Sequence, residues 1–131
     1  ALMLITHDLG VVSEMTDRIA VMYAGRIVET GRTEAVFRRM AHPYARGLFA
    51  ASPHGAALVR KAGEGRQRLA AIPGVVPDPL SRPPFCAFAD RCAFMQEDCR
   101  QAIPPLDRLG ESGGVAHRAA CFHPRDGEVV S

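Results

Sequence analysis

The chain opens with Leu2-Met3-Leu4-Ile5-Thr6-His7-Asp8, an apolar run that ends abruptly in a polar trio. This pattern predicts a buried strand over Leu2–Thr6 that delivers polar side chains to its carboxyl-terminal tip. In open α/β sheets, ligands bind at that edge of the sheet. Because such a strand normally follows other strands of its sheet, we expect the chain to be the C-terminal part of a larger α/β protein.

Composition excludes several classes of protein. The chain has 131 residues, of which 47% are hydrophobic, yet no apolar run reaches the roughly 18 residues that span a bilayer. Residues 1–6 lack the charged segment that begins a signal peptide. A net charge of +2 gives no electrostatic case for nucleic-acid binding. Lys61 is the only lysine, and it is not part of a Gly-x-x-x-x-Gly-Lys-Ser/Thr phosphate cradle.

Hydrophobic periodicity and turn residues predict five elements in the first half of the chain. Asp8 and Thr33 are expected to cap helices, and Glu34 favours the start of the second one. In order, we expect a helix over Leu9–Thr16, strands over Arg18–Tyr23 and Arg26–Glu29 joined by the turn Ala24-Gly25, the end of that unit at Gly31, a helix from Thr33 through Met40, and a helix from Pro43 to about Ala51.

The second half has a different character. Residues 55–70 show a weak pattern and are interpreted as a connector, whereas eight prolines and every cysteine lie beyond Ile72. Such a stretch is expected to form neither long helices nor a regular sheet, and to need something besides a hydrophobic core to hold it together. We therefore divide the chain into residues 1–40, a helical connector over 41–71, and a small irregular cysteine-containing extension over 72–131.

The four cysteines have the spacing Cys-x5-Cys-x6-Cys-x21-Cys: Cys86, Cys92, Cys99 and Cys121. Spacing alone favours zinc, although structural zinc sites usually contain a tighter pair. Two disulfides would require an oxidising compartment. An iron–sulfur cluster needs four thiolates, but the spacing matches neither common ferredoxin pattern. His117 and His123 flank Cys121 and are candidates to replace or supplement a ligand.

Residues 1–31 closely resemble the end of the nucleotide-binding domain of ABC transporters, including the hairpin over residues 17–29. The resemblance implies a C-terminal fragment of a P-loop ABC ATPase domain, with MgATP bound mostly by residues upstream. It also implies that His7 is the switch histidine, which contacts the γ-phosphate and helps orient the attacking water. A neutral imidazole offers one donor and one acceptor for that task. We expect this chain alone neither to bind nor to hydrolyse ATP.

Residues 42–121 resemble the C-terminal extension of oligopeptide and dipeptide importer ATPases. The matching segments are His42-Pro43-Tyr44, Ile72-Pro73-Gly74-Val75-Val76-Pro77, Pro83-Pro84-Phe85-Cys86-Ala87-Phe88 and Asp90-Arg91-Cys92. In this family the four cysteines are implied to hold a [4Fe–4S] cluster, with zinc as the alternative. The chain departs from the family at Phe85, at Ala89-Asp90 and at Ala93, which leaves the four ligands in place.

Together, the resemblances imply the ATP-binding subunit of an ABC importer for di- or oligopeptides. Its implied place is the cytoplasmic face of a bacterial or archaeal membrane, and its implied partners are transmembrane permease subunits, a second identical or homologous ATP-binding subunit and, indirectly, a solute-binding protein. No nucleic acid is expected. The alternatives are a nickel importer, a stand-alone metal-binding interaction module, and a disulfide-stapled secreted domain.

Overall fold

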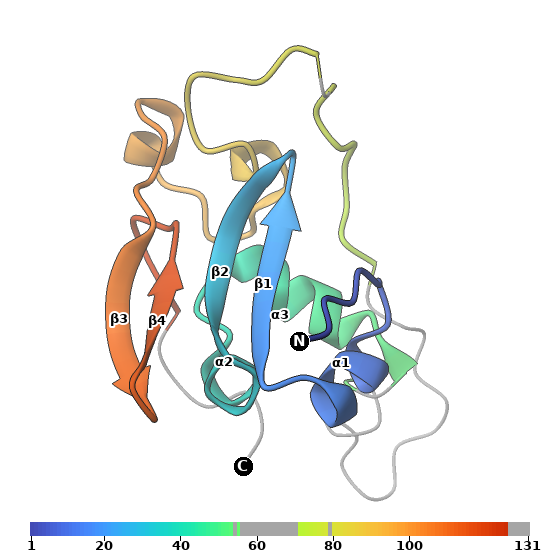
Figure 1. Cartoon of the computed structure of the whole chain (residues 1–131). Coiled ribbons are helices and arrows are strands. Elements are labelled where there is room, and N and C mark those ends of the chain that lie inside the picture. Colours follow the sequence, from blue (N-terminus) through green and yellow to red (C-terminus); the bar gives the residue numbers. More distant parts are fainter. Residues whose placement is uncertain (54, 56–70, 79, 126–131) are drawn as a thin grey trace, which may run out of the picture.

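The computed structural model describes residues 1–53, 55, 71–78 and 80–125. Nine helices and strands are assigned in this part of the chain (Figure 1). They are α1 (Leu9–Met15), β1 (Arg18–Tyr23), β2 (Arg26–Arg32), α2 (Thr33–Arg39), α3 (Pro43–Ala50), the 3-10 helices η1 (Ala89–Arg91) and η2 (Glu97–Arg100), β3 (Asp107–Ser112) and β4 (Val115–Ala119).

The four strands form one antiparallel sheet in the order β1-β2-β4-β3. β1 and β2 form the first hairpin, and β3 and β4 form the second. The two hairpins meet where Glu29 and Thr30 of β2 pair with Ala119 and Arg118 of β4. The mixed helix and sheet content agrees with the expected α/β composition. The sheet itself joins the predicted segments 1–40 and 72–131, and the division into three segments stays a proposal.

Each of the two hairpins has a tight turn whose two central residues have a positive φ. Ala24 and Gly25 have φ of 48° and 74°, and Gly113 and Gly114 have 52° and 76°. Positive φ at both central residues is the signature of the tight turn that matches the twist of a hairpin. The Ala24-Gly25 prediction is confirmed. The expectation of no regular sheet beyond Ile72 is wrong for β3 and β4, because residues 106–120 contain no proline and Gly113-Gly114 permits the turn.

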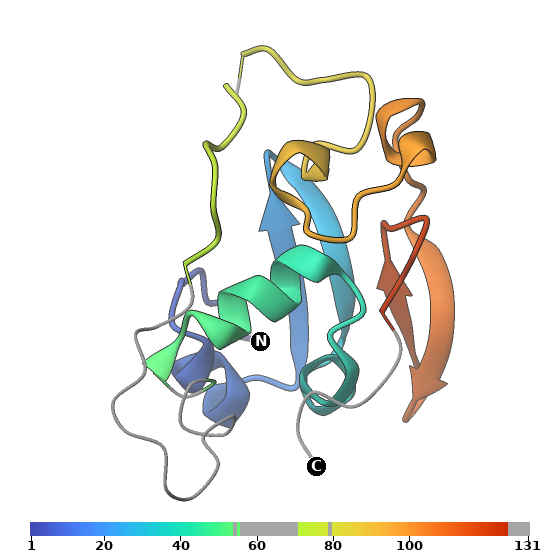
Figure 2. The ribbon, with the colours of Figure 1, turned by 180° about the vertical axis from the view of Figure 1, so that it is seen from behind.

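The helix α3 packs across one face of the sheet, as the view from behind shows (Figure 2). Its Phe49 meets Phe37 of α2 with ring centroids 5.9 Å apart. Phe88, from the cysteine-containing segment, meets Tyr23 of β1 edge-on at 5.2 Å. The core therefore draws on both halves of the chain: Leu9, Val21, Tyr23, Val28, Met40, Ala45, Phe49 and Phe88.

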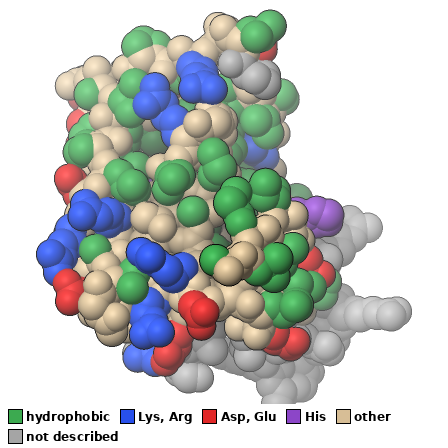
Figure 3. Space-filling model, viewed as in Figure 1, with side chains coloured by type: hydrophobic (Ala, Val, Ile, Leu, Met, Phe, Trp, Pro, Cys, Tyr) green, Lys and Arg blue, Asp and Glu red, His purple; other side chains and the backbone are tan. Residues whose placement is uncertain are grey.

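The prediction of a buried strand over Leu2–Thr6 is wrong. These residues form no strand, and their side chains are exposed. A strand needs a hydrogen-bonded neighbour, and no strand of the described residues pairs with this segment. Hydrophobic side chains gather on the face drawn in Figure 3. Leu2, Met3, Ile5 and Met22 are among the exposed hydrophobic residues of the described part of the chain.

The predicted helix caps have different outcomes. Asp8 caps α1 as expected, accepting hydrogen bonds from the backbone amides of Gly10 at 2.9 Å and Val11 at 3.2 Å. Thr33 is not a cap: it is the first residue of α2, and its hydroxyl lies 3.0 Å from the Thr16 hydroxyl.

Three element boundaries also differ from the prediction, and one of them is the end of α2, which lies at Arg39 rather than Met40. Gly31 does not end the hairpin, because β2 continues through Arg32. α1 ends at Met15 rather than Thr16. Apart from Gly55, the predicted connector over 55–70 lies outside the described residues. Within the described part of the chain, no helix combines the length and apolarity needed to cross a membrane.

Candidate metal centre

The four cysteines come together although they are spread over 36 sequence positions. Cys86 precedes η1, Cys92 follows η1, Cys99 lies in η2 and Cys121 follows β4. All four line one small apolar cavity, together with three phenylalanines, two prolines and two histidines: Phe88, Phe94, Phe122, Pro43, Pro104, His42 and His123. The four cysteines, which are irregularly spaced in the sequence, thus lie together in the structure as a single four-thiol cluster.

Short backbone hydrogen bonds place the first three cysteines. The amide of Cys86 donates to the carbonyl of Cys99 at 3.1 Å, which ties the first cysteine loop to η2. The amide of Cys92 donates to the carbonyl of Ala89 at 3.3 Å and closes η1. The β3–β4 hairpin brings in Cys121, since β4 ends two residues before it. Strand pairing with β2 therefore carries the most distant ligand into the cluster.

The cysteines are free thiols, of which Cys99 is buried and the other three are partly buried. Burial raises the pKa of the Cys86 and Cys92 thiols, and it raises that of Cys121 to about 11. The neighbouring cysteines raise all three further, whereas backbone amides of Phe88, Phe94 and His123 that donate to the sulfurs lower them. Such thiols need a nearby cation to become the thiolates that bind metal.

The spacing of the ligand atoms can be compared with what one zinc ion requires. In a tetrahedral zinc site with Zn–S near 2.3 Å, the sulfurs lie roughly 3.8 Å apart. Among the described residues, no three of the four thiols lie mutually within 4.8 Å. The thiols are therefore not gathered around a single point, as the ligands of one zinc ion would be. The cavity that they line has a free volume of only about 10 Å³, so a [4Fe–4S] cluster would need the side chains and loops around it to move apart.

Arg125 supplies a second sign of an anionic group. Its Nε is buried and has no hydrogen-bond partner among the described residues. The guanidinium stacks on Phe94, with its carbon 4.0 Å from the ring centroid, and its charge lowers the pKa of Cys92. An unpartnered buried N–H costs about 1–3 kcal/mol, so its place beside Cys92 fits a negatively charged centre.

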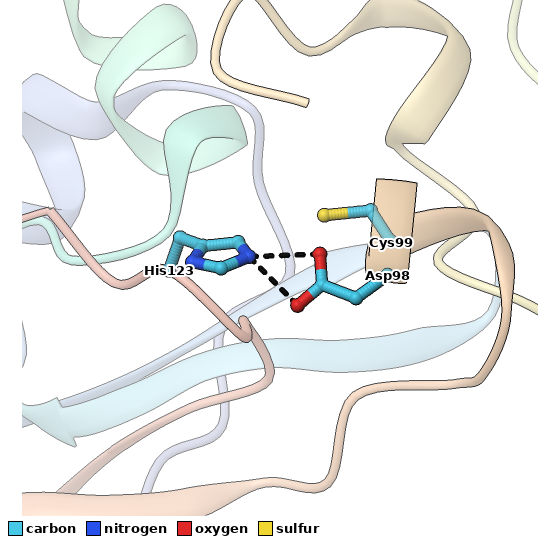
Figure 4. A group of neighbouring side chains, drawn as sticks. All are labelled: Asp98, Cys99 and His123. Carbon is cyan, nitrogen blue, oxygen red and sulfur yellow. Dashed lines mark hydrogen bonds and ion pairs between the residues drawn. The ribbon is translucent and has the colours of Figure 1, made fainter. Parts of the chain in front are cut away.

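Of the two histidines that flank Cys121, only His123 borders the cavity. Its Nε2 lies 2.8 Å from both carboxylate oxygens of Asp98 (Figure 4). His117 points elsewhere: its Nε2 lies 2.7 Å from Oε1 of Glu29. The expectation that His117 supplements the cysteines is therefore wrong.

Sequence analysis missed Glu29 altogether. This carboxylate is fully buried, with 0% of its surface exposed. It accepts hydrogen bonds from the backbone amides of Ala41 at 2.8 Å and His42 at 2.9 Å, in addition to the contact with His117. No local pattern could have identified it, because its partners lie on β4 and at the start of α3.

Arg91 fastens the residues before the first cysteine. Its guanidinium donates to the carbonyls of Pro73 at 2.8 Å and Ile72 at 3.1 Å, and to the Tyr23 hydroxyl at 3.3 Å. Because Arg91 directly precedes Cys92, one side chain links β1, the proline-rich segment and the cysteine cluster.

His7 lies apart from this cluster. It is exposed and directly precedes Asp8, the cap of α1. The structure therefore holds two separate candidate sites: an exposed histidine at the start of the chain and the partly buried four-thiol cluster.

Comparison with known proteins identifies the chain. The sequence model of the family described as "Oligopeptide/dipeptide transporter, C-terminal region" matches residues 28–99. This chain belongs to that family. The matched region of this transporter family contains three of the four cysteines and Glu29.

Curated relatives extend the similarity over most of the chain. A protein of Brucella ovis named as a peptide import ATP-binding protein is 45% identical over 115 residues, which are 86% of this chain and 33% of the relative. A Brucella abortus protein with the same kind of name is 43% identical over 118 residues, 90% of this chain and 32% of the relative. The chain thus spans about a third of the length of the curated relatives it matches.

Proposed function

We propose that this chain is the C-terminal part of the ATP-binding subunit of an ABC importer for di- or oligopeptides. The observation that carries this proposal is the 45% identity, over 86% of the chain, to a protein named for peptide import and ATP binding. The membership in the transporter C-terminal family supports the same conclusion. In this proposal the subunit acts at the cytoplasmic face of a bacterial membrane, with permease subunits and a second ATP-binding subunit as partners.

His7 is the residue of this chain that contacts the γ-phosphate in the proposed subunit. MgATP supplies the phosphoryl group and its metal when bound. The Asp8 cap fixes the start of α1 and therefore the backbone next to His7. The imidazole presents one donor and one acceptor, which suits contact with a phosphate oxygen and a water.

The exposed apolar segment over residues 2–5 is where we expect the rest of the nucleotide-binding domain to pack. Leu2, Met3 and Ile5 are each more than four-fifths exposed. Exposed apolar segments of this kind mark surfaces that other protein covers. In the proposed subunit, strands from upstream of this chain pair with the segment, which forms the strand that its sequence pattern predicts.

The four cysteines hold a [4Fe–4S] cluster in this proposal. The four thiols around one cavity, the amides that donate to the sulfurs and the unpartnered Nε of Arg125 support an anionic metal centre, and the family resemblance favours a cluster over a single zinc ion. Its role is structural: it fastens the loops that carry Cys86, Cys92 and Cys99 to the segment after β4. Such a link stabilises a segment in which the prolines prevent long helices from forming.

The proposal is tested in the intact subunit by ATP hydrolysis and by uptake of a labelled dipeptide. His7→Ala should abolish hydrolysis, whereas the matched control Asp8→Asn should retain it, because asparagine also caps helices. The native transporter should take up the dipeptide and not nickel ions, and His7→Ala should abolish the dipeptide uptake. Normal hydrolysis in the His7 variant, or saturable micromolar binding of ATP to this chain alone, would contradict the proposal.

A further inference from the structure

Asp98, Cys99 and His123 form a compact group (Figure 4), and Cys99 and His123 also line the four-thiol cavity. Asp98 and Cys99 are neighbours in η2, and His123 follows β4. One ligand atom from each residue lies within 4.8 Å of the other two. Among the described residues, this is the one triad that meets that spacing.

The donor set is that of a transition-metal site. A thiol sulfur, an imidazole nitrogen and a carboxylate oxygen are the three ligand types that zinc takes in proteins. With zinc–ligand bonds of about 2.0–2.3 Å, tetrahedral geometry places ligand atoms roughly 3.3–3.8 Å apart. The His123–Asp98 contact of 2.8 Å is already shorter than that, so the two side chains separate slightly around an ion.

Solvent reaches this group from one side. The side chains of Asp98 and His123 are 46% and 31% exposed, whereas Cys99 is only 7% exposed. An ion can therefore enter past the carboxylate and imidazole, and water can complete the fourth position. Zinc bound by one carboxylate, one thiolate and one neutral imidazole leaves no net charge at this half-buried place, which limits the desolvation cost.

We propose that Asp98, Cys99 and His123 bind one Zn²⁺ ion in protein that lacks the iron–sulfur cluster. Cys99 belongs to both ligand sets, so the two metal centres exclude each other. Cys86 and Cys92 belong only to the cluster. The zinc site does not depend on the proposed function, because its residues and its metal can be tested without cluster assembly.

The test uses the cluster-free 131-residue chain, freed of metal with a chelator, and Zn²⁺ as the probe in competition with a chromophoric chelator. The chain should bind one zinc ion. Asp98→Asn and His123→Ala should each weaken zinc binding by more than the roughly 10–100-fold that loss of an outer-shell contact costs. Cobalt substitution should give a thiolate-to-cobalt band that Cys99→Ser removes.

The matched control is Cys86→Ser, which should leave zinc affinity unchanged although it prevents assembly of the cluster. Circular dichroism of every variant establishes that it is folded, and Asp98→Glu should restore part of the affinity because it keeps a carboxylate. If Cys86→Ser weakens zinc binding as much as Asp98→Asn does, the four cysteines hold the zinc and the proposal is wrong. Unchanged affinity in Asp98→Asn and His123→Ala would also overturn it.

Discussion

His117 and Glu29 meet in the interior of the protein with 2.7 Å between Nε2 and Oε1, although 88 residues separate them in sequence. Glu29 lies on β2 and His117 on β4, so the contact reinforces the junction between the two hairpins. The same carboxylate accepts the backbone amides of Ala41 and His42 at the start of α3. One buried side chain therefore holds the sheet, the helix connection and the segment that leads to Cys121.

Glu29→Gln should destabilise the protein by about 2–3 kcal/mol, because the amide group of glutamine faces donors where the carboxylate accepted them. Urea unfolding followed by circular dichroism measures the loss, which suits a chain without tryptophan. A double-mutant cycle with His117→Gln should give a coupling of about 1–3 kcal/mol. Additive effects of the two substitutions would contradict a direct contact.

His42 predicts a dependence of stability on pH. Burial lowers its pKa from 6.5 to about 4, against the opposing charge of Glu29. His42 therefore becomes protonated near pH 6.5 in the unfolded chain, but only near pH 4 in the folded chain. The contribution of His42 to the free energy of unfolding is fully present above pH 6.5. It falls by up to about 3 kcal/mol as the pH drops toward 4.

The matched variant for this prediction is His42→Asn. The Nδ1 of His42 accepts the amide of Tyr44 at 3.1 Å and caps α3, and asparagine is a good helix cap that does not titrate. Urea unfolding at pH 7.5 and pH 5 should show a smaller loss of stability for the variant than for the native chain. Equal losses would assign the pH dependence to other groups.

Arg91→Ala should release the segment over residues 71–78 from β1. The substitution removes the hydrogen bonds to the carbonyls of Ile72 and Pro73 and to Tyr23. Elastase, which cuts after small apolar residues, should then cleave after Val75 severalfold faster. Arg100→Ala is the control, since Arg100 pairs with Asp90 at an exposed place. Equal cleavage of both variants would show that Arg91 does not hold the segment.

Arg125→Gln should lower the reduction potential of the proposed cluster, because a positive charge beside the thiolates favours the reduced, more negative form. The guanidinium stacks on Phe94 and its charge acts on Cys92, so glutamine removes that effect with little loss of volume. A redox titration followed by electron paramagnetic resonance measures the change. Arg100→Gln should leave the potential unchanged, and an equal shift in both variants would argue against a specific role of Arg125.

The first hairpin and the Asp8 cap of α1 could be predicted because their signals are local. Alternation in β1, the Ala24-Gly25 turn and the carboxylate of Asp8 each act within a few residues. The β3–β4 hairpin was missed because the prolines on both sides dominated the pattern, although Gly113-Gly114 gave a turn signal. Leu2–Thr6 carries a strand pattern, but the strand cannot form without a paired neighbour.

The candidate site was predictable only in part. Cys86, Cys92, Cys99 and Cys121 stand out by residue type, and the structure brings them to one cavity. The contacts of Asp98 with His123 and of Glu29 with His117 join residues that the tertiary fold alone places together. For the same reason, the sequence suggested His117 as a ligand, whereas the fold directs its ring to Glu29.

The central claim is tested most directly by the iron, acid-labile sulfide and zinc content of the anaerobically purified chain, with Cys86→Ser as the matched control. The account predicts about four iron and four sulfide per native chain, with broad visible absorption, and the loss of both in the variant. About one zinc per native chain without sulfide would contradict the cluster, and loss of that zinc in the Cys86→Ser variant would make the four cysteines a zinc site.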